Sequence, residues 1–167
     1  MQSILAPPSG LDTRAGKYLT FMVGKEEFGV AVLKVREIMG MQDVTSLPLT
    51  PSFLKGVLNL RGKVTPVIDL RLKFGLPGID TTERTCIVVV QVQGESTTIV
   101  IGIVVDEVSE VLTMASGDIE DTPDFGADVA TDYILGIARI KGKVKILLDI
   151  DRVLSSQDLR GLSSIIH

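Results

Sequence analysis

Several residue types that most catalytic and metal sites need are nearly missing from this 167-residue sequence. It has no tryptophan, one cysteine and one histidine, and that histidine is the last residue, His167. A chain end is a poor place for a catalytic base, so histidine-dependent triads and histidine-rich zinc sites are nearly excluded. The lone Cys86 cannot form an internal disulfide, which fits a reducing compartment.

Aromatic residues make up only 4% of the chain and apolar residues 45%, so a core must be built mainly from valine, isoleucine and leucine. These residue types favour strands. The net charge of -4 argues against nucleic acid or an anionic membrane as the main partner. The longest apolar run, residues 99–105, falls far short of the ~20 residues of a membrane helix, and no secretory signal is recognisable. We therefore expect a cytoplasmic protein without direct membrane insertion.

One pattern occurs twice in the chain, 80 residues apart. Residues 56–70 and 136–150 both start with glycine and contain two apolar runs that are joined by a basic residue, glycine and lysine. A second pair, residues 28–39 and 101–112, is related at an offset of 73. Two similar small units without obvious catalytic equipment indicate an architecture that presents surfaces to other molecules.

Short apolar runs separated by glycine turns fill most of the chain, which predicts an all-β fold of about ten strands. The two similar halves favour two small barrels over one sandwich. Asp69 and Asp149 each precede a stretch that can form a short capped helix, over residues 70–74 and 150–154. We expect these two helices to close the ends of the repeated hairpins.

The ends of the chain differ in composition from its middle. Residues 1–16 contain several prolines and glycines and few apolar residues, which predicts a flexible N-terminal tail. Residues 157–167 are expected to form a C-terminal tail that is frayed rather than packed. The folded domain should therefore span residues 17–156.

Familiar catalytic and metal motifs fail on their spacing. Residues 56–63 have five rather than four residues between the glycines, and Val64 stands where a P-loop needs serine or threonine. Ser52 and Lys55 match the Ser-x-x-Lys spacing of penicillin-binding enzymes, but the accompanying motifs are missing. The acidic stretch 118–128 does not follow the calcium-loop pattern. We expect no catalytic, cofactor-binding or metal-ligating residue.

Asn59 and Arg61 are the polar residues that stand out. Asn59 is the only asparagine and lies in the middle of an expected strand, where asparagine is disfavoured. Arg61 lies at the tip of the expected hairpin, where its planar fork of N–H donors suits a carboxylate on another protein. The alternative is that Asn59 bonds only to local backbone and that Arg61 is merely exposed.

These residues carry a resemblance to a known family. Asn59-Leu60-Arg61-Gly62, followed by Pro66-Val67-Ile68-Asp69-Leu70, strongly resembles a segment of the chemotaxis coupling protein family, CheW. The similarity covers most of the chain, roughly residues 17–156. It takes in residues 28–30, 35–38, 51–56, 102–106 and 136–154.

The resemblance implies two intertwined, five-stranded SH3-like barrels that share an apolar core and carry short capping helices. Members of the family are not enzymes and need no cofactor. They couple the SH3-like regulatory domain of the chemotaxis histidine kinase to the cytoplasmic tip of transmembrane, methyl-accepting chemoreceptors. A member is therefore expected to be cytoplasmic and recruited to membrane-associated receptor arrays.

The resemblance also implies which residues bind partners. Arg61 matches a contact arginine whose turn is shaped by its neighbours, and a nearby glycine matches one whose loss disturbs coupling. Two apolar positions match residues near the receptor groove. The implied partner-binding residues are Val35, Glu37, Gly56, Asn59, Arg61, Gly62, Ile87 and Val104.

Other functions stay open at this point. The chain could be an adaptor of a non-flagellar chemosensory system, which sequence does not separate from flagellar chemotaxis. A barrel that binds a small ligand or an oligonucleotide is less favoured, because the few aromatic residues are scattered along the sequence and stacking platforms need them. A hydrolase that uses only aspartate and lysine is the remaining alternative, and Asp69 and Asp106 would be its first candidates.

Overall fold

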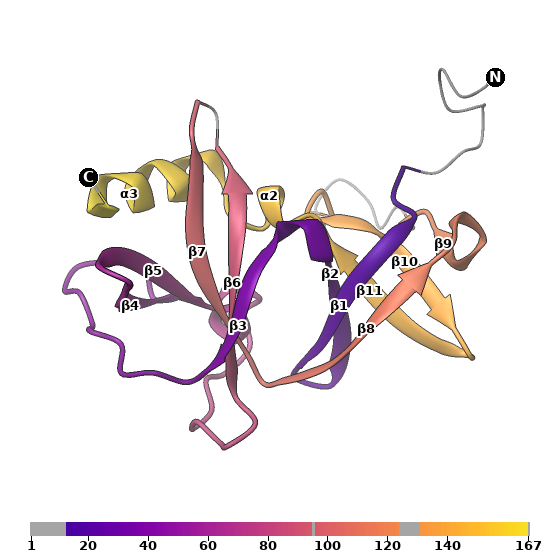
Figure 1. Ribbon diagram of the computed structural model, residues 1–167, viewed down its shortest axis with the longest axis horizontal. Helices are drawn as coiled ribbons and strands as arrows, with labels where there is room; N and C mark the ends of the chain where they lie inside the picture. Colours follow the sequence, from indigo (N-terminus) through magenta and orange to yellow (C-terminus); the bar gives the residue numbers. More distant parts are fainter. Residues whose placement is uncertain (1–12, 95, 124–130, 167) are drawn as a thin grey trace.

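The computed structural model describes residues 13–94, 96–123 and 131–166, so most of the expected N-terminal tail lies outside the described residues (Figure 1). Within them the chain is mostly strand, with a few short helices and one longer one. The strands are β1 (Gly16–Val23), β2 (Glu26–Ala31), β3 (Val35–Gly40), β4 (Leu54–Leu60), β5 (Lys63–Asp69), β6 (Cys86–Gln93), β7 (Thr98–Val105), β8 (Glu107–Met114), β9 (Ile119–Glu120), β10 (Ile134–Ile140) and β11 (Lys143–Leu148). The helices are η1 (Val32–Lys34), α1 (Leu70–Lys73), η2 (Ser116–Asp118), α2 (Ile150–Val153) and α3 (Ser156–Ile166).

The strands form two curled sheets that lie side by side (Figure 1). The six-stranded sheet has the order β8-β1-β2-β11-β10-β9 and is called the first barrel. The five-stranded sheet, with the order β3-β6-β7-β5-β4, is called the second barrel. The expectation of an all-β fold of two small barrels is confirmed, and the two-residue strand β9 is an addition to the first one.

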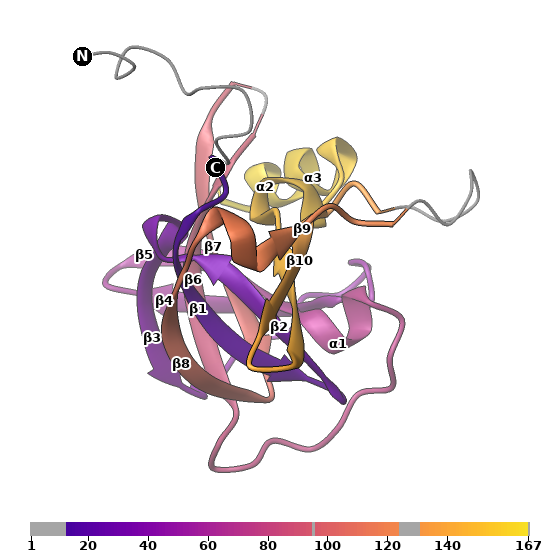
Figure 2. The same ribbon diagram turned by 90° about the vertical axis from the view of Figure 1, so that its right-hand side faces the viewer.

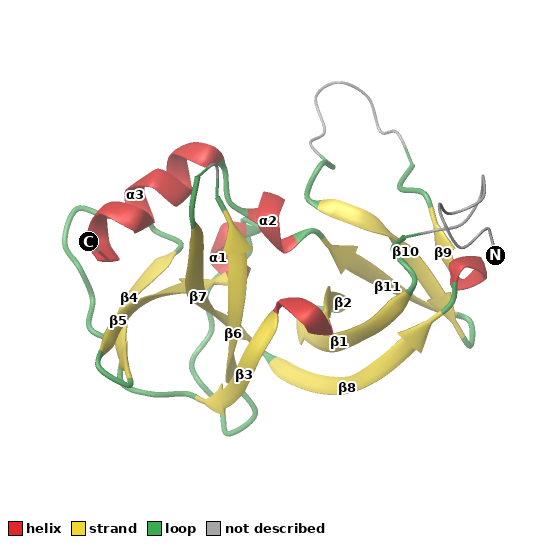
Figure 3. Cartoon of the chain, turned by 45° about the horizontal axis from the view of Figure 1, so that its top comes forward, coloured by secondary structure: helices red, strands yellow, loops and turns green. Residues whose placement is uncertain are grey.

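Each half of the chain contributes strands to both barrels. Strands β1 and β2 belong to the first barrel, but β3, β4 and β5 belong to the second. Strands β6 and β7 then stay in the second barrel, whereas β8 to β11 return to the first. The chain thus crosses between barrels twice, through η1 after β2 and at Asp106 after β7 (Figure 3). These two stretches are called the crossovers.

The repeat seen in the sequence reappears in the strand pairing. In the first barrel β2 and β11 run parallel, with Gly29 opposite Leu147. In the second barrel β7 and β5 run parallel, with Gly102 opposite Val67. The two glycines are 73 residues apart and their partners 80, which are the two offsets of the sequence repeat. The barrels are therefore built by the same pairing of equivalent strands.

Buried apolar side chains form one cluster between the barrels and one inside each of them. The central cluster joins Phe21 and Val30 of the first barrel to Val90 and Ile103 of the second. The cluster inside the first barrel consists of Tyr18, Met114, Ile119, Ala138 and Leu147. The cluster inside the second barrel consists of Val67, Ile87, Val89 and Val104. The two barrels thus share an apolar core, as the resemblance implied.

The two short capping helices are present and equivalent. Asp69 accepts a hydrogen bond from the backbone N–H of Arg71 at 2.9 Å and begins α1. Asp149 accepts one from the N–H of Asp151 at 3.1 Å and begins α2. Each aspartate satisfies an N–H that the first helical turn leaves unpaired. Each helix therefore starts where its hairpin ends.

The C-terminal segment differs from the expected frayed tail. Residues 156–166 form α3 (Figures 1 and 2), which lies beside β5 of the second barrel. Ser155 and Asp158 form a capping box, with reciprocal backbone-to-side-chain hydrogen bonds of 3.0 and 3.1 Å. Leu159 and Leu162 are buried in the central cluster. The segment is ordered because the cap and this apolar face act together.

The last residues of the expected N-terminal tail are also held by the domain. The guanidinium of Arg14 donates a hydrogen bond to the carbonyl oxygen of Leu135 at 2.8 Å and forms an ion pair with Asp121 at 3.1 Å. The hydroxyl of Tyr18 donates to the carbonyl oxygen of Arg14 at 2.7 Å. Because β1 begins at Gly16, the folded domain starts slightly earlier than the sequence predicted.

Candidate partner-binding surface

The β4–β5 hairpin turns at Arg61 and Gly62, which both have positive φ, +52° and +83°. This is the geometry of a type I′ turn, whose twist matches that of the flanking strands. The side-chain oxygen of Asn59 accepts a hydrogen bond from the N–H of Gly62 at 2.9 Å. Asn59 therefore stabilises the turn by a local bond, and Gly62 supplies the conformation that the turn needs. Together they hold Arg61 at the tip.

Arg61 forms an ion pair with Glu37 on the edge strand β3. The Arg61 side chain remains 72% exposed and that of Glu37 26%. An exposed pair of this kind contributes little to stability. A guanidinium has more N–H donors than one carboxylate oxygen can use, so Arg61 can still bind an acidic group on a partner. The structure thus brings two of the expected contact residues together.

Gly56 explains why this corner of the second barrel is closed. Its φ is +150°, and a Cβ at this position would lie 2.1 Å from the carbonyl oxygen of Thr45. Thr45 and the next residue, Val57, exchange two backbone hydrogen bonds of 2.9 and 2.8 Å. This bridge joins the segment after β3 to β4. Gly56 is needed because only glycine lets the two backbones approach so closely.

Exposed apolar side chains flank the hairpin, and sequence reasoning did not identify them. Ile38, next to Glu37 on β3, is 45% exposed, and Val64, after the turn on β5, is 47% exposed. We call Glu37, Asn59, Arg61 and Val64, together with Ile38 on the opposite face of β3 from Glu37, the Arg61 patch. No alternation with buried residues marks them, because β3 has no buried residue and Val64 precedes a run of five buried residues on β5.

A related patch lies on the first barrel. Val111 on β8 and Val144 on β11 are 55% and 48% exposed, and they stand at the repeat offsets from Ile38 and Val64. Here the ion pair is formed by Arg139 and Glu120, 2.8 Å apart. We call Val111, Glu120, Arg139 and Val144 the Arg139 patch. At the repeat offsets Glu37 and Arg61 correspond to Glu110 and Lys141, so the equivalent positions differ in charge where Arg139 stands in place of Asn59.

Comparison with known proteins identifies the family. The CheW-like domain family matches residues 17–158. The chain belongs to the CheW-like family. It is 41% identical over 148 residues to the chemotaxis protein CheW of Klebsiella aerogenes, covering 89% of this chain and 87% of the relative. It is 36% identical over 154 residues to that of Rhizobium meliloti, covering 87% and 97%.

A solved CheW structure supports the fold. The crystal structure of the scaffolding protein TtCheW from Thermoanaerobacter tengcongensis matches with a TM-score of 0.75 at 29% identity. The match covers 86% of this chain and 95% of the other. Protein FrzA of Myxococcus xanthus is 32% identical over 165 residues, covering 95% of this chain and 99% of the relative. This CheW-like protein is a non-enzymatic scaffold of chemotaxis.

The remaining partner residues expected from CheW-like proteins lie deeper. Val35 is half-buried and packs against the central cluster. The side chain of Ile87 is 0% exposed and that of Val104 8%, and both belong to the cluster inside the second barrel. In this structure Ile87 can therefore influence a partner only through the residues that pack around it. Any role of these two positions in receptor binding stays a prediction.

One ion pair of this CheW-like protein is almost fully buried. The ammonium of Lys145 on β11 donates to the carboxylate of Glu27 on β2 at 2.6 Å, and the side chains are 6% and 18% exposed. Burial alone would raise the pKa of Glu27, but the hydrogen bond and charge of Lys145, helped by Thr20 and Ser109, lower it below its usual value. The pair joins two neighbouring strands, so its role is structural.

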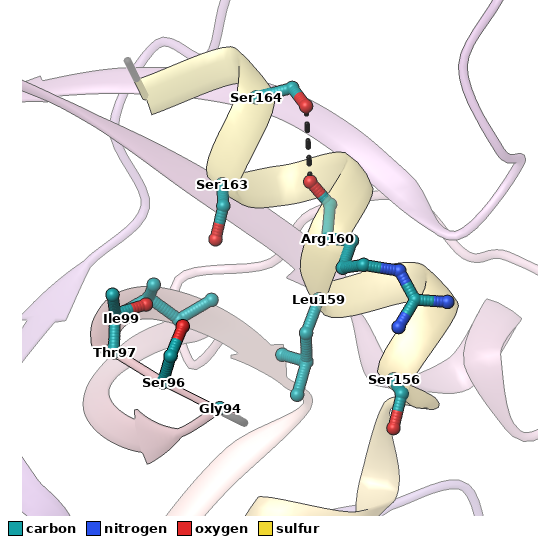
Figure 4. A pocket seen from close by; sticks show the side chains of 9 residues that line it. All are labelled: Gly94, Ser96, Thr97, Ile99, Ser156, Leu159, Arg160, Ser163 and Ser164. Carbon is teal, nitrogen blue, oxygen red and sulfur yellow. Dashed lines mark hydrogen bonds between the residues drawn. The ribbon is translucent and has the colours of Figure 1, made fainter.

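One cavity of the described residues lies beside the C-terminal helix. The cavity in Figure 4, about 420 Å³, lies between α3 and the β6–β7 turn. Its polar lining is mainly hydroxyls, and Arg160 extends along the other side of the helix from Leu159 (Figure 4). Among the described residues, no three acidic, cysteine or histidine side chains cluster as a metal site requires. No helix of that part is long and apolar enough to cross a membrane.

Proposed function

We propose that the Arg61 patch and the Arg139 patch are the two surfaces through which this CheW-like scaffold couples chemoreceptors to the chemotaxis histidine kinase. The coupling role comes with the family, whose members match nearly the whole chain. The assignment of that role to two patches is the proposal. It places one partner on each barrel, so that coupling depends on the rigid connection between the barrels rather than on a chemical step.

The observation that carries the proposal is the duplication of an exposed apolar pair with different charged neighbours. Ile38 and Val64 recur as Val111 and Val144. Isolated exposed apolar residues are common on proteins, but exposed apolar residues that recur at both repeat offsets favour contact surfaces. The charges differ because Asn59 is replaced by Arg139 at the equivalent position. Different charges suit different partners, since complementary charge selects the partner more than it adds affinity.

The proposed partners are the regulatory domain of the kinase and the cytoplasmic tip of a transmembrane chemoreceptor. Binding to a receptor tip would bring the protein to the membrane-associated array. Single contacts in such an array are expected to be weak, with Kd near micromolar, about -8 kcal/mol. Many weak contacts in one assembly add up to stable attachment.

A charge reversal with a matched control tests the proposal. Arg61→Asp should abolish the binding of one partner, and Arg139→Asp that of the other, in pull-downs with a kinase regulatory domain and a receptor fragment. Arg84→Asp is the control, because Arg84 is also 72% exposed and also ion-paired, with Glu107. All three variants should keep the free energy of unfolding within about 0.5 kcal/mol of the parent. Unchanged binding in Arg61→Asp would remove the Arg61 patch from the mechanism.

A further inference from the structure

The two crossovers are the places where the chain passes from a strand of one barrel to a strand of the other. One is the η1 turn, which ends at Lys34, and the other is Asp106 between β7 and β8. Apolar packing in the central cluster is non-directional. Directional bonds at the crossovers can therefore decide how one barrel is oriented on the other, and both crossovers carry such bonds.

At the crossover between β7 and β8, Asp106 accepts two hydrogen bonds through the same carboxylate oxygen. One comes from the guanidinium of Arg71 at 2.5 Å and the other from the backbone N–H of Gly24 at 2.8 Å. Arg71 lies on α1, which follows β5 of the repeated hairpin in the second barrel, whereas Gly24 lies in the β1–β2 turn of the first. The side chains of Arg71 and Asp106 are 15% and 21% exposed. We call this arrangement clasp 1.

At the η1 crossover a similar arrangement is found with the two barrels exchanged. It again consists of a helix that follows a repeated hairpin, the crossover itself and the end of a hairpin in the other barrel. Asp151 lies on α2, which follows the last hairpin strand of the first barrel. Its carboxylate accepts from the ammonium of Lys34 at 2.8 and 3.0 Å and from the backbone N–H of Gln93 at 2.8 Å. Gln93 is the last residue of β6 in the second barrel. We call this arrangement clasp 2.

The two clasps are equivalent, although their sequences are not similar. Arg71 and Asp151 are 80 residues apart, which is the offset of the hairpin repeat. In clasp 1 the helix supplies the base and the crossover the acid, and in clasp 2 the helix supplies the acid and the crossover the base. In both, the carboxylate also accepts an N–H from the end of the neighbouring hairpin. The same ion pair is therefore made twice, with the charges exchanged.

We propose that Arg71, Asp106, Lys34 and Asp151 are positioning residues, which hold the two barrels in the one relative orientation that lets both patches be occupied together. The inference rests on the proposed function for its consequence, but its physical content is the geometry between the barrels. Breaking a clasp should leave each patch intact. It should affect only the step that needs both patches in a fixed relation.

Inter-barrel distances test the clasps without any partner. Spin labels are attached to cysteines introduced at Lys63 and Lys143, which are exposed and lie at equivalent positions just after the two hairpin turns, in a Cys86→Ser background. Double electron–electron resonance should give a narrow distance distribution for the parent. Arg71→Asp or Asp106→Lys should broaden or shift it, and the two changes combined should restore it, because they recreate the charge order of clasp 2.

Matched variants keep the distance experiment decisive. Glu107→Lys is the control, because it reverses a charge next to Asp106 in an ion pair outside the clasps, with 43% of the Glu107 side chain exposed. If a charge-reversed variant does not fold, Asp106→Asn removes the charge and keeps an acceptor for the N–H of Gly24. Distributions that match the parent in the folded single variants, or a double variant that remains broadened, would overturn the inference.

Binding measurements separate this inference from the proposed function. In Asp106→Asn, the Kd for each partner alone should stay within about twofold of the parent, whereas the Kd for the second partner in the presence of the first should rise about tenfold. A protein that only lost stability would weaken all of these values together. If the parent binds neither partner, the proposed function fails. The distance measurements still test whether the clasps fix the orientation of the two barrels.

Discussion

Replacing Gly56 with alanine should open the corner of the second barrel that supports Arg61. The added Cβ would lie 2.1 Å from the carbonyl oxygen of Thr45 and 2.6 Å from its carbon. Backbone atoms cannot move aside as the end of a flexible side chain can. The substitution should therefore break both hydrogen bonds between Thr45 and Val57 and separate the segment after β3 from β4.

The size of the effect follows from these contacts. Two lost backbone hydrogen bonds contribute about 1 kcal/mol each. The positive φ of Gly56 adds about 1–2 kcal/mol once the residue has a side chain. We expect a loss of about 3–4 kcal/mol in the free energy of unfolding, which is a large part of the ~5–15 kcal/mol of a typical domain.

Two other glycines of the same region provide graded controls. Gly62 has a φ of +83° but nothing within 4 Å of an added Cβ, so Gly62→Ala should cost only the backbone term, about 1–2 kcal/mol. Gly40 has no positive φ and nothing within 4 Å of an added Cβ, so the free energy of unfolding of Gly40→Ala should stay within about 0.5 kcal/mol of the parent. Urea unfolding followed by circular dichroism measures all three. Equal midpoints for Gly56→Ala and Gly62→Ala would refute the idea that the Thr45 bridge closes the barrel.

Two further predictions concern stability. Lys145→Met should cost about 1–3 kcal/mol in urea unfolding, because it leaves the carboxylate of Glu27 without its partner. The pKa of Glu27 is lowered in the folded protein, so the ionised carboxylate stabilises the fold above the ordinary glutamate pKa, and this stabilisation is lost as the pH falls through the folded pKa. Glu27→Gln should therefore lose less stability than the parent on acidification. An equal loss in the two proteins would contradict this. Leu162→Ala should lower the free energy of unfolding by about 2–5 kcal/mol, because Leu162 is only 3% exposed. Gln157 is exposed on the same helix, so Gln157→Ala should leave that free energy almost unchanged. Equal effects of the two substitutions would show that α3 does not support the core.

Repetition made the local structure predictable from the sequence. The hairpins at residues 57–68 and 137–148 and the caps at Asp69 and Asp149 follow from turn chemistry and short-range patterning, and the structure confirms them. Such features depend on residues close together in the chain. The pairing of β3 with β6 and of β8 with β1 does not, so the sequence alone could not show which barrel each strand joins.

Burial was less predictable where apolar residues run without interruption. In residues 87–90 and 99–105 no alternation shows which face of the strand is covered, so the burial of Ile87 and Val104 could not be read. The aromatic residues are scattered in the sequence, yet Phe28 stacks on Phe74 with ring centroids 5.2 Å apart. That contact joins distant segments and is visible only in the fold.

The helix α3 had a local signal in the sequence, whereas the clasps did not. Ser155 and Asp158 have the spacing of a capping box, and apolar residues follow at helical spacing, which together predict α3. The clasps are different, because their acids and bases exchange places between the repeats. A search for similar residues at the repeat offset could not find them, since Arg71 corresponds to Asp151.

Joint binding is the most direct test of a scaffold that works by holding two neighbours at once. The parent protein is co-sedimented with a kinase regulatory domain, with a receptor fragment, and with both together. We predict that both partners are recovered in one complex, that Arg61→Asp removes only one of them, and that Arg139→Asp removes only the other. Competition between the two partners for a single site, or loss of both partners in either variant, would contradict the account.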